Sequence, residues 1–163
     1  MIFVTTGSTK QSSYYLPLIE KLEQLKKDDL IQEDIVIQAG YAYFESDMFK
    51  EIFDFTTDFE SYIDKAEIVI TADGAGTIFD LLRKNKKTIV VPNVLASRYG
   101  APAEDFIGGF ERDGNLVWCK DINNILEDIE IAKNKQFSRY QSPNNNISES
   151  IMKAFDNWKS NAL

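Results

Sequence analysis

A glycine turn flanked by acids is the part of this sequence best suited to chemistry. It reads Asp73-Gly74-Ala75-Gly76-Thr77, and it follows the apolar run Glu67–Thr71 and precedes a second apolar stretch. We interpret it as a buried strand, a turn and the start of a helix. Such a junction directs unpaired backbone N–H groups and the positive end of the helix dipole at one place. A phosphate is the anion that most often binds there.

Two carboxylates accompany this turn. Asp80 lies three residues after Thr77, where it can meet sugar hydroxyls beside a bound phosphate, so the first hypothesis is a nucleotide-sugar site. Each acid also has a purely structural interpretation. Asp73 suits the N-cap of a helix that begins near Gly76, and Asp80 suits the first turn of that helix because an acid there favours the dipole.

A second glycine loop, Thr6-Gly7-Ser8-Thr9, follows the first predicted strand, and a third loop, residues 93–103, follows a later one. Ligands of open parallel sheets bind beyond the carboxyl ends of the strands. We therefore expect these loops to meet the Gly74 turn at one edge. The alternative for Gly7 is a plain connection between a strand and a helix.

Composition excludes several kinds of site. The chain of 163 residues contains no histidine, which excludes imidazole bases, Ser-His-Asp triads and histidine-bearing metal sites. Its net charge of −8 disfavours nucleic acid as a partner. The single Cys119 forms no internal disulfide and fits a reducing cytoplasm. Acid–base chemistry would fall to carboxylates, tyrosine, lysine or the substrate.

Short apolar runs alternate with helical patterns along the chain. The predicted strands are Ile2–Thr6, Asp34–Gln38, Ile52–Thr56, Glu67–Thr71, Thr88–Pro92 and Leu116–Cys119. The predicted helices are Leu16–Lys27, Phe59–Lys65, Thr77–Asn85, Ala103–Arg112 and Ile122–Lys133. Strands that are apolar on both faces and separated by helices predict an α/β fold, a single doubly wound, Rossmann-like parallel sheet.

The pattern divides the chain into three parts. Residues 1–133 form the predicted Rossmann-like domain, residues 134–147 a polar linker, and residues 148–163 a C-terminal helix. Ile147, Ile151, Phe155 and Trp158 form an apolar stripe along that helix. Two interpretations of this stripe stay open: it packs on its own domain, or it docks on a partner protein.

Read together, these segments resemble the C-terminal, donor-binding half of GT-B glycosyltransferases of the MurG-like family 28 type. The resemblance rests on the Gly7 loop, on Gln38-Ala39-Gly40, on Ala66–Leu82 and on Ile89–Asn93. More narrowly, the chain resembles the stand-alone small subunits of split transferases. These include the PssE- and EpsF-type proteins of bacterial polysaccharide synthesis and the cytosolic subunit of the eukaryotic dolichol-linked N-acetylglucosamine transferase.

The resemblance implies a nucleotide-sugar site. Its predicted members are Gly7, Asp73, Gly74, Ala75, Gly76, Thr77, Asp80, Asn93 and Asp105. In the family, the turn at Gly74 meets the donor diphosphate, the acid at position 80 holds sugar hydroxyls of the nucleotide, and Gly7 lets the acceptor approach the donor. The family uses no protein-bound metal, so no cofactor is expected, and the catalytic residues stay unknown.

Two places depart from the family pattern. The family usually carries a histidine and a small residue before the glycine turn, where this chain has Ala72 and Asp73. A family run of acid and amide side chains in the next helix falls on Asp105, where Phe106 and Ile107 replace the following residues. Either the donor is held differently, or this copy has lost activity.

The resemblance thus predicts the donor-binding subunit of a two-component inverting glycosyltransferase in polysaccharide or glycan synthesis. It would be a hexosyltransferase subunit that uses a UDP-sugar and a lipid-linked acceptor. We expect a cytoplasmic chain recruited to the inner face of the membrane by a membrane-anchored PssD/EpsE-like partner, with a homodimer as an alternative state. Two other functions stay open: a catalytically degenerate partner subunit of the same fold, and a flavodoxin-like FMN-binding module that uses the Gly7 loop.

Overall fold

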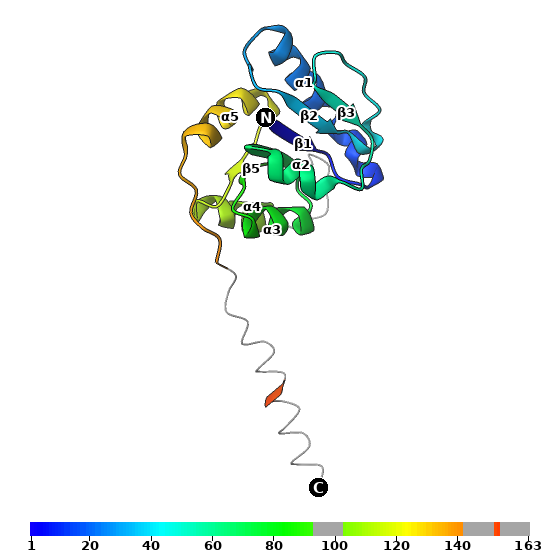
Figure 1. Ribbon diagram of the computed structural model, residues 1–163. Coiled ribbons are helices and arrows are strands. Elements are labelled where there is room, and N and C mark those ends of the chain that lie inside the picture. Colours follow the sequence, from blue (N-terminus) through cyan, green and yellow to red (C-terminus); the bar gives the residue numbers. More distant parts are fainter. Residues whose placement is uncertain (93–102, 142–151, 154–163) are drawn as a thin grey trace.

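A six-stranded, entirely parallel sheet forms the centre of the molecule (Figure 1). The computed structural model describes residues 1–92, 103–141 and 152–153. Its strands are β1 Ile2–Thr5, β2 Ile35–Gln38, β3 Glu51–Phe53, β4 Ile68–Ala72, β5 Lys87–Val91 and β6 Val117–Trp118. They lie in the order β3-β2-β1-β4-β5-β6.

Helices cover both faces of this sheet (Figure 1). Helices α1 (Leu16–Lys27) and α5 (Ile125–Asn134) pack on one face, against the side chains of Ile2, Val4 and their neighbours. Helices α2 (Phe59–Lys65), α3 (Ala75–Arg83) and α4 (Ala103–Arg112) cover the other face. Successive strand residues point to opposite faces, so a strand buried on both sides must be apolar throughout.

The predicted fold class is therefore confirmed. Helices α1, α2 and α4 have the bounds expected from the sequence. Helix α5 begins at Ile125 instead of Ile122, and α3 begins at Ala75 instead of Thr77 and ends at Arg83 instead of Asn85. The third strand ends at Phe53 instead of Thr56, and a 3₁₀ turn, Ile122–Asn124, precedes α5.

The strand order creates a topological switch point between β1 and β4. From β1 the chain continues through α1 to β2 on one side, and from β4 it continues through α3 to β5 on the other side. The two connections leave the sheet on opposite faces. In open α/β sheets, ligands bind in the crevice that such a reversal leaves beyond the carboxyl ends of the strands.

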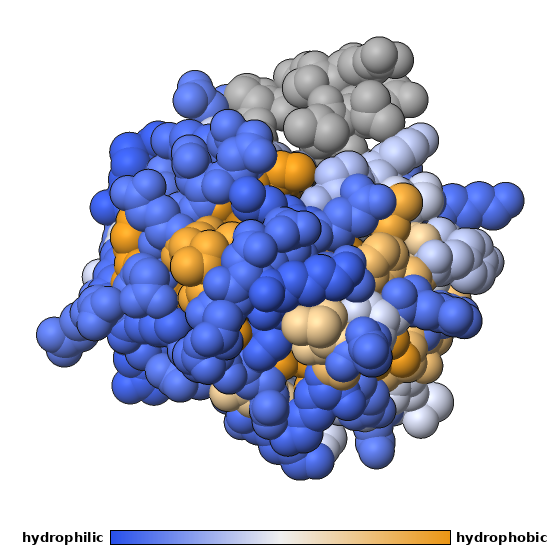
Figure 2. Space-filling view, turned by 90° about the horizontal axis from the view of Figure 1, so that it is seen from above, coloured by the Kyte–Doolittle hydropathy of each residue, from blue (hydrophilic) through white to orange (hydrophobic). Residues whose placement is uncertain are grey.

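The segment after α5 lies against the domain as far as the structure describes it. Phe137 packs on the core beneath α1 and α5, and Tyr140 packs on the cluster beneath α3 and α4. The predicted C-terminal helix falls mostly outside the described residues; Met152 and Lys153 are helical and exposed. Within the described ranges, no helix is long and apolar enough to cross a membrane. On the face drawn in Figure 2, hydrophobic residues are visible in limited areas between hydrophilic ones.

Candidate functional site

Helix α3 presents an exposed N-terminus at the switch point. Gly74 is its N-cap residue, and Gly74, Ala75 and Gly76 are all exposed. The N–H groups of the first helical residues have no carbonyl of their own helix to bind. A Cβ atom added at Gly76 would meet nothing within 4 Å, so the space in front of this helix start is open. The geometry is that of an anion site.

The Gly7 loop lies at the same edge of the sheet, after β1, the strand paired with β4, and neighbouring residues hold it in place. Gly7 has a φ of +88°, and its N–H donates to Oγ1 of Thr5 at 3.3 Å. Oγ1 of Thr6 donates to the carbonyl of Ala39 at 2.7 Å, which joins this loop to the loop after β2. Gly40 is required there, because its φ is +60° and a Cβ would lie 2.7 Å from the carbonyl oxygen of Gly7.

Tyr15 connects the segment after the Gly7 loop to the segment before α3. This residue ends the 3₁₀ turn Lys10–Tyr15 that follows the Gly7 loop, and its hydroxyl donates to Oδ1 of Asp73 at 3.1 Å. Its side chain is buried. Burial, and next the Asp73 carboxylate, raise the pKa of the Tyr15 hydroxyl well above its usual value. The tyrosine therefore stays protonated, and it holds one oxygen of the carboxylate that stands before α3.

This contact corrects the structural role suggested for Asp73. The sequence indicated an N-cap for a helix beginning near Gly76, whereas the N-cap residue is Gly74 and the helix begins at Ala75. The Asp73 carboxylate instead binds Tyr15, which is 58 positions away in the chain. Local patterns carry no signal for that partner, so sequence reasoning did not find Tyr15.

Thr5, Gln38 and Thr71 form a polar row beneath the crevice. They are paired in register across three adjacent strands, since Thr5 lies beside both Gln38 and Thr71. All three residues are buried, and Oε1 of Gln38 has no hydrogen-bond partner in the described part of the chain. Oγ1 of Thr5 accepts from the N–H of Gly7, and Oγ1 of Thr71 donates to the carbonyl of Ala72, so the two threonines support the chain at the carboxyl edge of the sheet.

The remaining predicted site residues differ in how closely they approach the helix start. Asp80 is exposed on the second turn of α3, where it pairs with Arg83 at 3.3 Å. Arg83 lies farther along α3 than Asp80, so this ion pair does not direct the carboxylate toward the Gly74 turn. Asp105 is exposed on the first turn of α4. Asn93 lies outside the described residues.

Phe106 and Ile107, the altered family positions on α4, are packing residues. Ile107 is fully buried beneath α3 and α4. The ring of Phe106 makes an edge contact with Phe79 of α3 at 5.8 Å between centroids and another with Phe110 at 5.3 Å. These side chains fix α4 against α3, and the amide and carboxylate of the family pattern are missing here.

A hollow of about 140 Å³ lies at the same edge, between the start of α1 and the ends of β5 and β6. It is lined by Tyr14, Tyr15, Pro17, Leu18, Val91, Pro92, Cys119, Lys120, Asp121 and Ile122. Tyr15 thus belongs both to the hollow and to the crevice. No group of acids and cysteines in the described ranges is arranged to hold a metal ion.

Fold and site together define a class: a doubly wound α/β domain with an exposed helix start at its switch point. Comparison with known families narrows this class. Residues 1–100 match the glycosyltransferase family 28 C-terminal domain, so the chain belongs to that family.

Solved structures agree with the fold. The NMR structure of ALG13 is similar with a TM-score of 0.56 and 19% identity, over 90% of this chain and 92% of that one. The crystal structure of the glycosyltransferase SnogD from Streptomyces nogalater is similar with a TM-score of 0.51 and 14% identity. There the match covers 81% of this chain and 36% of SnogD. No curated protein matches the chain.

Proposed function

We propose that this chain is the donor-binding subunit of a two-component inverting glycosyltransferase, with a UDP-sugar as donor and a lipid-linked sugar as acceptor. The observation that carries the proposal is the exposed start of α3, which faces the Gly7 loop across the switch point of a family 28 domain. The diphosphate of the donor would lie on the N–H groups of Ala75, Gly76 and Thr77, and Asp80 would hold its ribose.

The reaction is a displacement at the anomeric carbon of the donor sugar. The acceptor oxygen forms a bond to that carbon, the bond to the UDP oxygen breaks, and the acceptor proton goes to a base. Negative charge grows on the departing diphosphate, where the α3 N–H groups and the helix dipole stabilise it. The base belongs to the partner in this proposal.

The extent of the two structural matches fits a donor-binding half. The chain matches nearly all of ALG13 and 36% of the longer SnogD chain. A donor-binding half needs a second half to carry the acceptor, and a lipid-linked acceptor requires that half to be at the membrane. We therefore propose a cytoplasmic chain recruited to the membrane by a PssD/EpsE-like subunit, through residues 148–163 after the linker.

Calorimetric titration with UDP, UDP-glucose, UDP-galactose and UDP-N-acetylglucosamine tests the donor site. We expect UDP to bind and one sugar to add affinity. The variant Gly74→Pro keeps the N–H groups of Ala75, Gly76 and Thr77, because Gly74 lies before the helix. Its ring would occupy the space at the helix start, so we expect UDP binding to be abolished. Absence of heat with every nucleotide, with the partner present as well as without it, would refute the enzyme proposal.

One alternative has a specific observation in its favour: a catalytically degenerate partner subunit. Asp73 places a carboxylate before the helix start, and Phe106 and Ile107 pack where the family has polar donor contacts. Binding of the partner subunit without nucleotide binding would establish this second function. The family match gives the FMN-binding alternative no support.

A further inference from the structure

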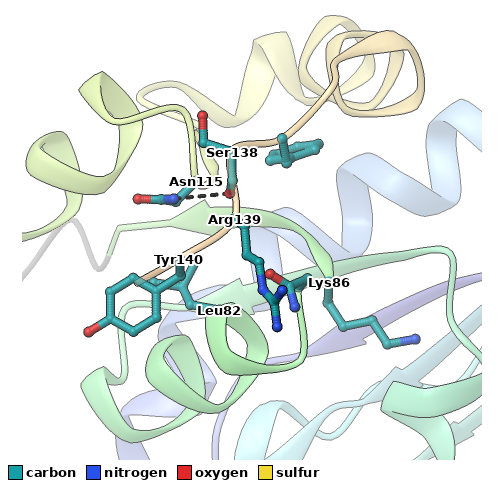
Figure 3. A pocket seen from close by; sticks show the side chains of 8 residues that line it. Leu82, Lys86, Asn115, Ser138, Arg139 and Tyr140 are labelled. Atoms are coloured by element: carbon teal, nitrogen blue, oxygen red, sulfur yellow. Dashed lines mark hydrogen bonds between the residues drawn. The ribbon is translucent and has the colours of Figure 1, made fainter. Parts of the chain in front are cut away.

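A pocket of about 310 Å³ lies at the opposite edge of the sheet from the crevice, where β5 and β6 begin (Figure 3). It lies between the end of α3 and the segment after α5. The lining residues are Leu82, Asn85, Lys86, Asn115, Phe137, Ser138, Arg139 and Tyr140. Its volume is at the lower end of the range for small-molecule sites.

The walls of this pocket are fixed by hydrogen bonds. Nδ2 of the buried Asn115 donates to the carbonyl of Ser138 at 3.0 Å, as Figure 3 shows. The N–H of Ser138 donates in turn to the carbonyl of Gly114 at 3.0 Å. Phe137 and Tyr140 are each packed against a core cluster. The segment that forms one wall is therefore tied to the domain at several points.

The lining contains two cations and no carboxylate, although the whole chain has a net charge of −8. The Lys86 ammonium donates to the carbonyls of Asp64 and Ala66. Lys135, beside the Phe137 ring, donates to the carbonyl of Leu116. Within the described ranges, no ion pair is formed by Lys86, Lys135 or Arg139.

Neighbouring lysines differ in this respect. Lys84 pairs with Glu60 and Asp64, and Lys87 pairs with Glu67. Backbone carbonyls hold the ammonium groups of Lys86 and Lys135, and the Lys86 charge also acts on the Asp64 carboxylate. Arg139, by contrast, forms no side-chain hydrogen bond or ion pair within the described ranges, so its guanidinium is the group that can bind a ligand. Arg139 is exposed, and Figure 3 shows its side chain reaching across the pocket toward α3.

The C-terminal end of α3 disfavours binding of an anion in this pocket, because a helix C-terminus carries roughly half a negative charge. That effect is smaller than the two whole positive charges of Lys86 and Arg139 in the lining. The last carbonyls of α3 are also occupied, since those of Leu81 and Leu82 accept from the N–H groups of Lys86 and Asn85. The net field therefore favours an anion.

We propose that this pocket binds a phosphomonoester, with the phosphate on the Arg139 guanidinium and an apolar part against Leu82 and Tyr140. A planar guanidinium matches a phosphate through two parallel hydrogen bonds. Leu82 and Tyr140 supply the apolar wall on the side of α3. The site is separate from the donor crevice and does not depend on the proposed transferase function.

The test is an NMR titration of the full chain with inorganic phosphate and with phenyl phosphate, against sodium chloride at equal ionic strength. We expect saturable shifts of the Asn85 and Asn115 side-chain amides and of the Arg139 Nε–H signal, with phenyl phosphate binding at least tenfold more tightly than phosphate. Binding is also measured to vesicles of phosphatidic acid, whose headgroup is a phosphomonoester, and to vesicles of phosphatidylcholine, whose headgroup is a phosphodiester. Arg139-dependent binding to the former alone would assign the phosphate to a lipid headgroup.

Arg139→Gln should weaken phenyl phosphate binding at least tenfold. Arg112→Gln is the matched control, because Arg112 is also exposed, at the end of α4, and does not line the pocket. Equal shifts with chloride, or equal losses in the two variants, would overturn the proposal. UDP binding is measured on the same samples, so failure of this site is distinguishable from failure of the donor site.

Discussion

The Tyr15 hydroxyl lies 3.1 Å from Oδ1 of Asp73 and thereby joins the two strands that border the crevice. Tyr15 follows β1, and Asp73 follows β4. One hydrogen bond therefore spans the switch point of the sheet. It also bears on donor binding, because the Asp73 carboxylate stands directly before the helix start that would hold a diphosphate.

Removing this hydroxyl should cost both stability and affinity. In Tyr15→Phe the packed ring stays, while the hydrogen bond to a carboxylate is lost, which is worth about 1–2 kcal/mol at a half-buried site. Without this hydroxyl donor, the negative charge of the Asp73 carboxylate is less compensated and should weaken UDP binding several-fold. Urea unfolding and calorimetry measure the two effects. Tyr14→Phe is the control, since Tyr14 is 46% exposed; equal effects of both substitutions would contradict the role of Tyr15.

Stability should fall at alkaline pH, partly through Tyr15. The folded-state pKa of Tyr15 is raised, first by burial and then by Asp73, whereas an unfolded tyrosine titrates near pH 10. Above that pH the unfolded chain loses a proton that the folded chain retains. The contribution of Tyr15 is therefore complete below about pH 10 and is lost as pH rises toward the folded pKa. Between pH 9 and 11, Tyr15→Phe should lose less stability than the unchanged chain, as followed by urea unfolding at each pH.

Gly76→Ala should separate folding from binding. Alanine is the better helix former, and a Cβ at position 76 meets nothing within 4 Å, so the variant should be more stable by about 0.5 kcal/mol. The methyl group would occupy the open space before the helix start, where the diphosphate is proposed to lie. We expect UDP affinity to fall at least tenfold. A more stable variant with unchanged affinity for UDP would place the diphosphate elsewhere.

Asp80 provides a test of ribose binding. Its exposed ion pair with Arg83 contributes little to folding, so Asp80→Asn should change the free energy of unfolding by less than about 0.5 kcal/mol. UDP affinity should fall about tenfold, because a charged acceptor for the ribose hydroxyls is lost.

The longer Asp80→Glu variant should bind UDP at least as tightly as the unchanged chain. Calorimetry with UDP and with inorganic diphosphate distinguishes ribose contacts from phosphate contacts, since only UDP carries a ribose. Equal affinity of Asp80→Asn and the unchanged chain for UDP would show that Asp80 does not bind the ribose and only forms the ion pair with Arg83 on α3.

Much of the fold could be predicted because each element is encoded by its own residues. The helix Leu16–Lys27 and the strand Ile35–Gln38 follow from local periodicity and continuous apolar runs. The Gly74 turn was predicted for the same reason, since a strand, a turn and a helix are adjacent in the chain. The first residue of α3 was not predicted, because the Asp73 carboxylate binds the distant Tyr15 hydroxyl and Gly74 is the N-cap residue.

The sequence by itself determined the alternation of strands and helices and the position of the glycine turns within it. Only the tertiary structure decided the strand order, and with it the pairing of β1 and β4 that brings the Gly7 loop and the Gly74 turn to the same edge of the sheet. It also brought Tyr15 to Asp73 and Arg139 to the end of α3. The physical reason is that periodicity and turn chemistry act over a few residues, whereas these contacts join segments far apart in the chain and depend on how the helices pack on the sheet.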